Sequence, residues 1–244
     1  MQFIFILILF LLVFKFFSAK IHIKWYTFAK RGFRKFDNNF GLFCYTGKQG
    51  KGKTYSAINF CIEQKLKCDY TIITNIKSFN AFSDTIYMDN INDIIDYCTS
   101  FRENEKNVLI LFDEIFTVLE KGTPLNKKIL SFLSQLRKRQ IIMVTTAQEW
   151  SEINITFRRY VRYQISCNMF SLPILRIAFC YNSINDGDLI SWNSETQDFQ
   201  APRIRANFEK AQKRVVQSYD TYETINLDYS LNQKNNSRVV PLRR

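Results

Sequence analysis

The chain has 244 residues, of which 34 are Lys or Arg and 22 are Asp or Glu, so its formal net charge at neutral pH is +12. Its 46% of hydrophobic and 23% of charged residues exclude a disordered chain and allow one sizeable α/β domain with appendages. The positive charge favours an acidic partner, either nucleic acid or an anionic membrane face, although Lys enrichment can also arise without any function.

The first element in chain order is an apolar segment. Residues Phe3 to Phe14 are unbroken apolar, and the stretch resumes after Lys15 up to Ala19, which is about the shortest length that spans a membrane as a helix. Basic residues follow this segment and none precedes it, so the positive-inside rule places the N-terminus outside and the remaining chain in the cytoplasm. We expect a single-pass transmembrane anchor over residues 1–20 and a basic juxtamembrane segment over residues 21–40. A cleaved signal peptide and a buried core helix are the alternatives.

Strands and helices alternate along the next part of the chain. Apolar and β-branched runs predict strands at residues 41–46, 70–75, 108–112, 141–146, 161–167 and 174–181. Helical spacing predicts helices at residues 53–67, 90–101, 124–139 and 207–217. This alternation argues for an α/β domain over residues 41–218 with a doubly wound parallel sheet. The polar residues 219–244 are expected to form a flexible tail.

The most informative motif is the octamer GKQGKGKT, from Gly47 to Thr54. It lies between a short strand and a helix, as a phosphate-binding loop requires, and it holds three of the seven glycines. Lys53 would reach the β- and γ-phosphates, and the Thr54 hydroxyl would bind Mg²⁺. We therefore expect ATP and Mg²⁺ as cofactors. The predicted nucleotide-binding residues are Gly47, Lys48, Gln49, Gly50, Lys51, Gly52, Lys53, Thr54 and Tyr55.

A pair of carboxylates follows the buried strand VLILF. Asp113 is placed to hold Mg²⁺, and Glu114 to polarise the attacking water, although the pair could also be an ordinary strand end. A later strand ends in TTAQ, where Gln148 would lie beside the γ-phosphate if that strand is inserted between the other two. A catalytic Glu with an inserted strand describes P-loop NTPases of the additional-strand class, which is the fold we expect.

Two adjacent arginines, Arg158 and Arg159, end the informative part of the sequence. One of them could be an arginine finger that reaches the γ-phosphate in a neighbouring subunit. They could instead contact DNA phosphates, or they could be solvated surface residues. These three interpretations stay open on the sequence alone.

The region from Gly41 to about Cys167 resembles the zonular occludens toxin-like family, which includes the filamentous-phage assembly ATPases and belongs to the FtsK–HerA superfamily. Three segments carry the resemblance: GLFCYTGKQGKGKT, LILFDE and QLRKRQIIMVTTAQEWSEINITFRRYVRY. The third is the most discriminating. Family members usually carry the ATPase first and the membrane span after it, whereas here the apolar segment comes first.

The resemblance implies an ATP hydrolase that works as a homo-oligomeric ring at the inner (cytoplasmic) membrane of a host cell. Its partners would be DNA, specifically a single-stranded phage genome, the membrane and other virion-assembly proteins. Gln148 would be the sensor, and Arg158 or Arg159 the finger. The alternatives are a viral DNA-packaging or conjugative DNA-translocating ATPase, and a membrane scaffold that nucleotide only gates.

Overall fold

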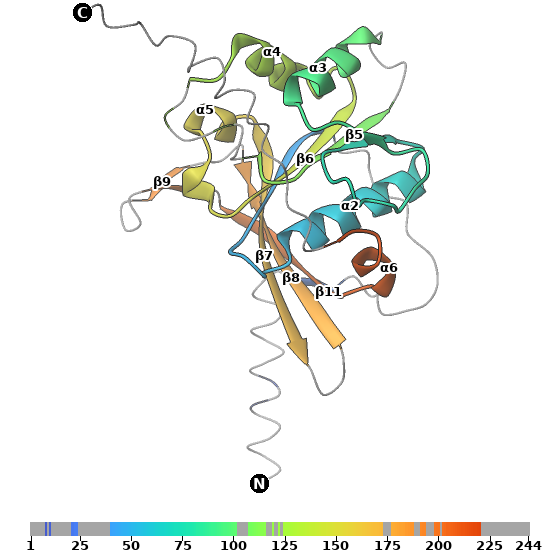
Figure 1. Cartoon of the computed structure of the whole chain (residues 1–244). Coiled ribbons are helices and arrows are strands. Elements are labelled where there is room, and N and C mark those ends of the chain that lie inside the picture. The colour runs from blue at the N-terminus through green and yellow to red at the C-terminus, as the bar shows by residue number, and fades with distance from the viewer. Residues whose placement is uncertain are drawn as a thin grey trace, which may run out of the picture.

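The structure is a computed structural model, and its parts are arranged as Figure 1 shows. It describes residues 8, 10, 21–23, 40–101, 107–115, 119, 122, 124–172, 177–187, 191–193, 198–200 and 202–220. The predicted anchor over residues 1–20 lies outside the described residues, except for Ile8 and Phe10. The described part contains no helix that is both long and apolar enough to cross a membrane.

A nine-stranded mixed sheet forms the centre of the domain, in the order β1-β11-β8-β7-β2-β6-β5-β3-β4. The strands are β1 (Ile21–Ile23), β2 (Gly41–Thr46), β3 (Thr71–Thr74), β4 (Ile86–Tyr87), β5 (Val108–Phe112), β6 (Ile141–Ala147), β7 (Val161–Leu172), β8 (Ile177–Asp186) and β11 (Arg203–Lys210). Short strands β9 (Ser191–Asn193) and β10 (Asp198–Gln200) form a separate antiparallel pair.

Strand β6 lies between β2 and β5, and it pairs with both in parallel. This is the inserted strand that the additional-strand class requires. All pairs from β7 through β2, β6, β5 and β3 to β4 are parallel. The expectation of an α/β domain with parallel strands is therefore confirmed for this part of the sheet.

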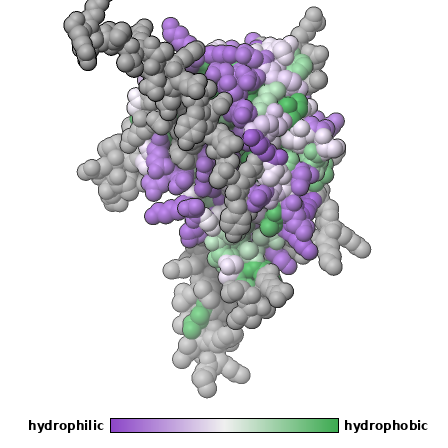
Figure 2. Space-filling view, viewed as in Figure 1, coloured by the Kyte–Doolittle hydropathy of each residue, from purple (hydrophilic) through white to green (hydrophobic). Residues whose placement is uncertain are grey.

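The expectation of a wholly parallel sheet is wrong beyond β7. Strands β7 and β8 form an antiparallel hairpin, and β8 pairs with β11 in the same antiparallel sense. Only residues 173–176 separate β7 from β8, whereas a crossover between parallel strands needs a dozen or more residues. The hairpin extends past the body of the domain (Figure 1). On the face in Figure 2, hydrophobic side chains gather towards its end, where Phe170 and Leu172 are exposed.

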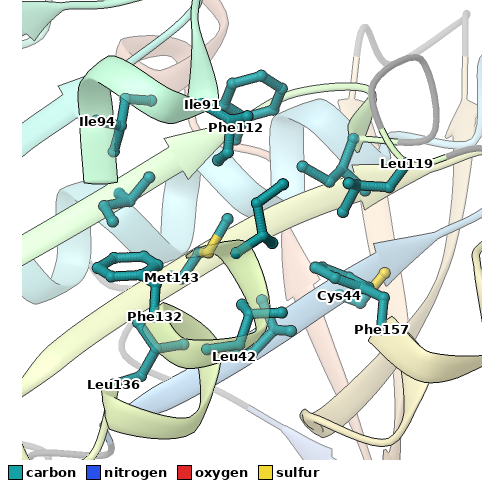
Figure 3. Close-up of a cluster of buried hydrophobic side chains, with 14 of the residues drawn as sticks. Leu42, Cys44, Ile91, Ile94, Phe112, Leu119, Phe132, Leu136, Met143 and Phe157 are labelled. Carbon is teal, nitrogen blue, oxygen red and sulfur yellow. The ribbon is translucent and has the colours of Figure 1, made fainter. Parts of the chain in front are cut away.

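Helices cover both faces of the sheet because alternate side chains on each strand point to opposite faces. On β2, Phe43 and Tyr45 pack on the side of helix α2 (Lys53–Lys67). Leu42 and Cys44 pack on the other side, in the core that Figure 3 shows. That core also takes the apolar faces of helices α3 (Ile91–Ser100), α4 (Lys127–Gln135) and α5 (Ile155–Arg158).

The helix expected at residues 207–217 is wrong. Residues Arg203–Lys210 form strand β11, which lies between β8 and the edge strand β1. Of the expected helix, only Lys213–Val216 are helical, as α6. The backbone of Asn207 lies opposite Asn182 of β8, so pairing with an existing hairpin outweighs the local helical spacing. On its other side β11 takes the parallel strand β1.

Candidate functional site

The loop from Gly47 to Thr54 joins β2 to α2 at the carboxyl edge of the parallel strands. Its first residue is tied to the end of β6, because the Gly47 N–H donates to the carbonyls of Ala147 (3.3 Å) and Gln148 (3.2 Å). A further bond closes the loop, from the Lys51 N–H to the Lys48 carbonyl (3.1 Å). These backbone bonds hold the loop in place.

Gly52 is the residue on which the close packing of this loop depends. It precedes helix α2 with a φ of 76°, in the left-handed region that side chains disfavour. A Cβ atom added there would lie 2.8 Å from the Met169 Cε of β7. Helix α2 is fifteen residues long and begins at Lys53, so its unpaired N–H groups and positive dipole end face the loop.

The side chains of Thr54 and Asp113 meet across the site. The Thr54 hydroxyl donates to both Asp113 carboxylate oxygens at 3.2 Å. Burial raises the pKa of the Asp113 carboxyl above its usual value, although the hydrogen bond from the Thr146 hydroxyl opposes the rise. A cation bound between this hydroxyl and this carboxylate would offset the cost of burying the charge.

These two side chains fit a magnesium ion. Hydroxyl and carboxylate oxygens are ligands that Mg²⁺ accepts, and in nucleotide sites the ion takes its other ligands from phosphates and water. No group of three or more His, Cys, Asp or Glu side chains that could hold a metal is found within the described residues. Thr54 and Asp113 would supply two of the ligands of such an ion, and the nucleotide and water would supply others.

Glu114 has a left-handed backbone with a φ of 55°, which is uncommon for a residue with a side chain. Its N–H donates to the Thr146 hydroxyl at 2.8 Å, and that hydroxyl donates in turn to Asp113. Strained backbone of this kind persists where the surroundings fix it, as at functional sites. Thr146 thus fixes both carboxylate residues at once.

Asn75 fixes the same turn from the other side. It follows β3, and its amide makes two bonds to the Asp113 backbone: the Asp113 N–H donates to Oδ1 (2.8 Å), and Nδ2 donates to the Asp113 carbonyl (3.0 Å). The two strands that flank β5 therefore both hold its end. No role was predicted for Asn75 from the sequence, and the signal that could have found it is the polar residue at the end of the strand YTIITN.

A cavity of about 350 Å³ opens beside these groups. It brings together most of the predicted site, namely Gln49, Gly50, Gly52, Lys53, Thr54, Tyr55, Asp113 and Glu114. Five further residues line it that sequence reasoning missed: Ile76, Met169, Val216, Tyr219 and Asp220. They come from strand β7, helix α6 and two loops that are distant in sequence, and no motif marks them.

Other predicted residues lie outside this cavity or are largely buried in its wall. Lys48 and Lys51 are exposed and line a separate shallow hollow beside β7 and β8. Gln148 contributes its carbonyl to the loop, and its side chain is half-buried. Its role as a sensor stays a prediction. Tyr55 lines the cavity but is itself buried, and its hydroxyl accepts a bond from the Gln212 N–H at 2.7 Å.

The two arginines have different environments. Arg158 is buried, donates to the carbonyls of Ile153 (2.9 Å) and Ser151 (2.7 Å), and lies over the Trp150 ring. It braces the 3₁₀ helix Trp150–Glu152 and the turn that follows it. Arg159 is exposed. Of the two, only Arg159 has its side chain at the surface, where a neighbouring subunit could be reached.

Comparison with known proteins gives one family match and several structural likenesses. The family model described as "Zonular occludens toxin (Zot)" matches residues 41–172, which is more than half of the chain. No curated protein sequence matches. The N-terminal domain of zonular occludens toxin from Neisseria meningitidis is similar in structure, with 14% identity and a TM-score of 0.46, over 74% of this chain and 98% of that one. The genome packaging NTPase B204 from Sulfolobus turreted icosahedral virus 2, in complex with ATP-gammaS, gives 10% identity and a TM-score of 0.46, over 68% and 97%.

Proposed function

We infer, from the premise that the chain belongs to the zonular occludens toxin (Zot) family, that it is a magnesium-dependent P-loop ATPase. The observation that carries this proposal is the junction of Thr54, Asp113 and Glu114 in one cavity with the glycine loop. The glycine loop, the Thr54 hydroxyl of α2 and the two carboxylates after β5 come from three separate parts of the chain. An ordinary tight turn would not need these groups to lie together.

The phosphates of the nucleotide would lie along the loop from Gly47 to Thr54. Backbone N–H groups there and at the start of α2 would bind their oxygens, and the buried Lys53 would neutralise part of their charge. Thr54 and Asp113 would hold Mg²⁺, which neutralises negative charge on the β- and γ-phosphates when it is bound.

Glu114 would act as the general base. It is next to Asp113, lines the same cavity and is only partly buried, so a water molecule can reach its carboxylate. Thr146 holds the backbone that carries it. Glu114 would accept the proton of the water that attacks the γ-phosphate, while Gln148 would orient that water.

Arg159 would complete the site of a neighbouring copy. It follows α5, which is itself held by the buried Arg158, so its backbone is held at the surface. A guanidinium that reaches the γ-phosphate from another subunit stabilises charge in the transition state. In this proposal the active form is a homo-oligomeric ring.

The work done by hydrolysis would be the movement of DNA, a single-stranded phage genome, across a membrane during virion assembly with other assembly proteins. The net charge of +12 supports an acidic polymer as partner, and the apolar residues 3–14 support anchoring of the N-terminus in the inner membrane. Removal of residues 1–20 should then release the protein from membranes washed with alkaline carbonate.

The test of this function is ATP hydrolysis by the purified full chain with and without single-stranded DNA. We expect turnover that DNA stimulates. Lys53→Ala should abolish it, and Glu114→Gln should lower kcat by about 100-fold or more with ATP still bound.

Normal virion assembly by the Glu114→Gln variant would instead support a nucleotide-gated scaffold, because a motor stalls when ATP is trapped. An unstimulated ATPase together with normal assembly by Lys53→Ala would refute the motor.

A further inference from the structure

One wall of the nucleotide cavity comes from the end of the described chain. Val216, Tyr219 and Asp220 line the same cavity as the phosphate-binding loop, together with Ile76 from the loop after β3. Val216 and Tyr219 lie more than 160 positions after Lys53 in the sequence. The fold brings them to the nucleotide loop because α6 packs against α2 (Figure 1).

This wall is fixed at three points. The Gln212 N–H donates to the Tyr55 hydroxyl of α2 at 2.7 Å. The Asn80 N–H donates to the Ser218 carbonyl at 2.9 Å, and the Asp220 N–H donates to the Ser78 hydroxyl at 2.9 Å. Val215, fully buried, packs in the core below α2. The wall is therefore a built part of the domain.

The chemistry of the wall differs from that of the loop opposite. Val216 is 51% exposed although it is apolar, and Tyr219 packs as a partly buried ring against the α2 core. Ile76, which is buried, adds a further apolar side chain, and Asp220 contributes a carboxylate to this wall. Apolar and aromatic side chains do not bind phosphate, but they provide the surface that a flat, uncharged ring system needs.

We propose that Val216 and Tyr219, with Ile76, form the subsite for the nucleobase of the bound nucleotide. This rests on the proposed function, since the triphosphate must occupy the loop from Gly47 to Thr54. The base stacks against the Tyr219 ring and covers Val216. Tyr55, through its bond to Gln212, couples the phosphate side of the site to the base side.

The test compares ATP with a ligand that keeps the three phosphates and lacks the nucleoside. Binding of ATP and of inorganic tripolyphosphate, both with Mg²⁺, is measured calorimetrically on the full chain. Tyr219→Ala and Val216→Ser should each weaken ATP binding by about tenfold and leave tripolyphosphate binding unchanged. Val216 is half exposed, so its substitution keeps the fold. Tyr87→Ala, which removes a tyrosine on β4 that is 41% exposed, is the matched control and should change neither affinity.

Two results would overturn the subsite. One is unchanged ATP affinity in both variants, and the other is an equal loss of ATP and tripolyphosphate affinity, which would show a general disturbance of the cavity. A wild-type chain that binds neither ligand would refute the proposed ATPase itself, which is a separate and distinguishable failure.

Discussion

At the scale of single residues, the site depends on a hydroxyl group that carries no charge. Thr146 accepts a hydrogen bond from the Glu114 backbone and donates one to the Asp113 carboxylate. One side chain thereby holds both the Asp113 carboxylate and the backbone that carries the proposed base. Because Thr146 belongs to the inserted strand β6, the strand order of the sheet has a direct chemical consequence at this point.

Replacement of this hydroxyl by a methyl group should therefore impair catalysis more than binding. Thr146→Val should lower kcat by about 10- to 100-fold, as expected for lost hydrogen bonds to a charged group, with little change in the Kd of ATP. Steady-state hydrolysis and equilibrium binding measure the two effects.

Thr145→Val is the control, because the Thr145 hydroxyl bonds to the Phe43 carbonyl, away from the carboxylates. Equal kcat values for the two variants would contradict the role of Thr146.

At the scale of elements, the segment between β6 and β7 carries an arginine pair with divided roles. Arg158 is bonded to two carbonyls of its own turn and lies over Trp150. Arg158→Ala would leave those carbonyls without their donor in a buried place. We expect the free energy of unfolding to fall by about 2 to 3 kcal/mol, which denaturant titration would measure.

Arg159→Ala should behave in the opposite way. Its side chain is exposed, so the midpoint of unfolding should stay within the error of the wild-type value. Hydrolysis by the assembled protein should nevertheless fall by about 1000-fold if Arg159 is the finger. A variant that hydrolyses ATP normally would remove Arg159 from the mechanism.

At the scale of the whole molecule, the proposed ring predicts how a mixture of two inactive variants behaves. Lys53→Ala supplies an intact Arg159 but no working loop, and Arg159→Ala supplies the reverse. A mixture of the two inactive variants should regain part of the DNA-stimulated ATPase, because some interfaces then combine both intact halves. Activity that stays at background would argue that each subunit hydrolyses ATP alone.

Much of the parallel half of the fold could be predicted from the sequence. The bounds of β2, α2 and β5 agree with the predicted ranges, because continuous apolar strands and an adjacent glycine loop are strong local signals. Strand β11 could not be predicted, since its conformation depends on pairing with β8 and β1. The spacing of apolar residues there favours a helix, but pairing with the two neighbouring strands outweighs it.

The site was predictable to a similar extent. Lys53, Thr54, Asp113 and Glu114 follow from motif and spacing, and the structure places all of them in one cavity. The contribution of Tyr219 was not predictable, because it depends on where a distant segment crosses the domain. The sequence alone also does not distinguish Arg158 from Arg159, since only the fold determines which of the two is buried.

The central position of β2 has a consequence for synthesis of the chain. Both of its neighbours come much later: Gly41 pairs with Ile142, and Leu42 with Val161. At ordinary rates of translation, this strand waits roughly 6 to 25 seconds before the second partner leaves the ribosome. Throughout that interval a strand that is buried along its whole length in the folded domain has at least one unpaired edge, which exposes the nascent chain to misassembly. Nucleotide could not stabilise it, because the loop that follows β2 is only fixed once β6 has arrived.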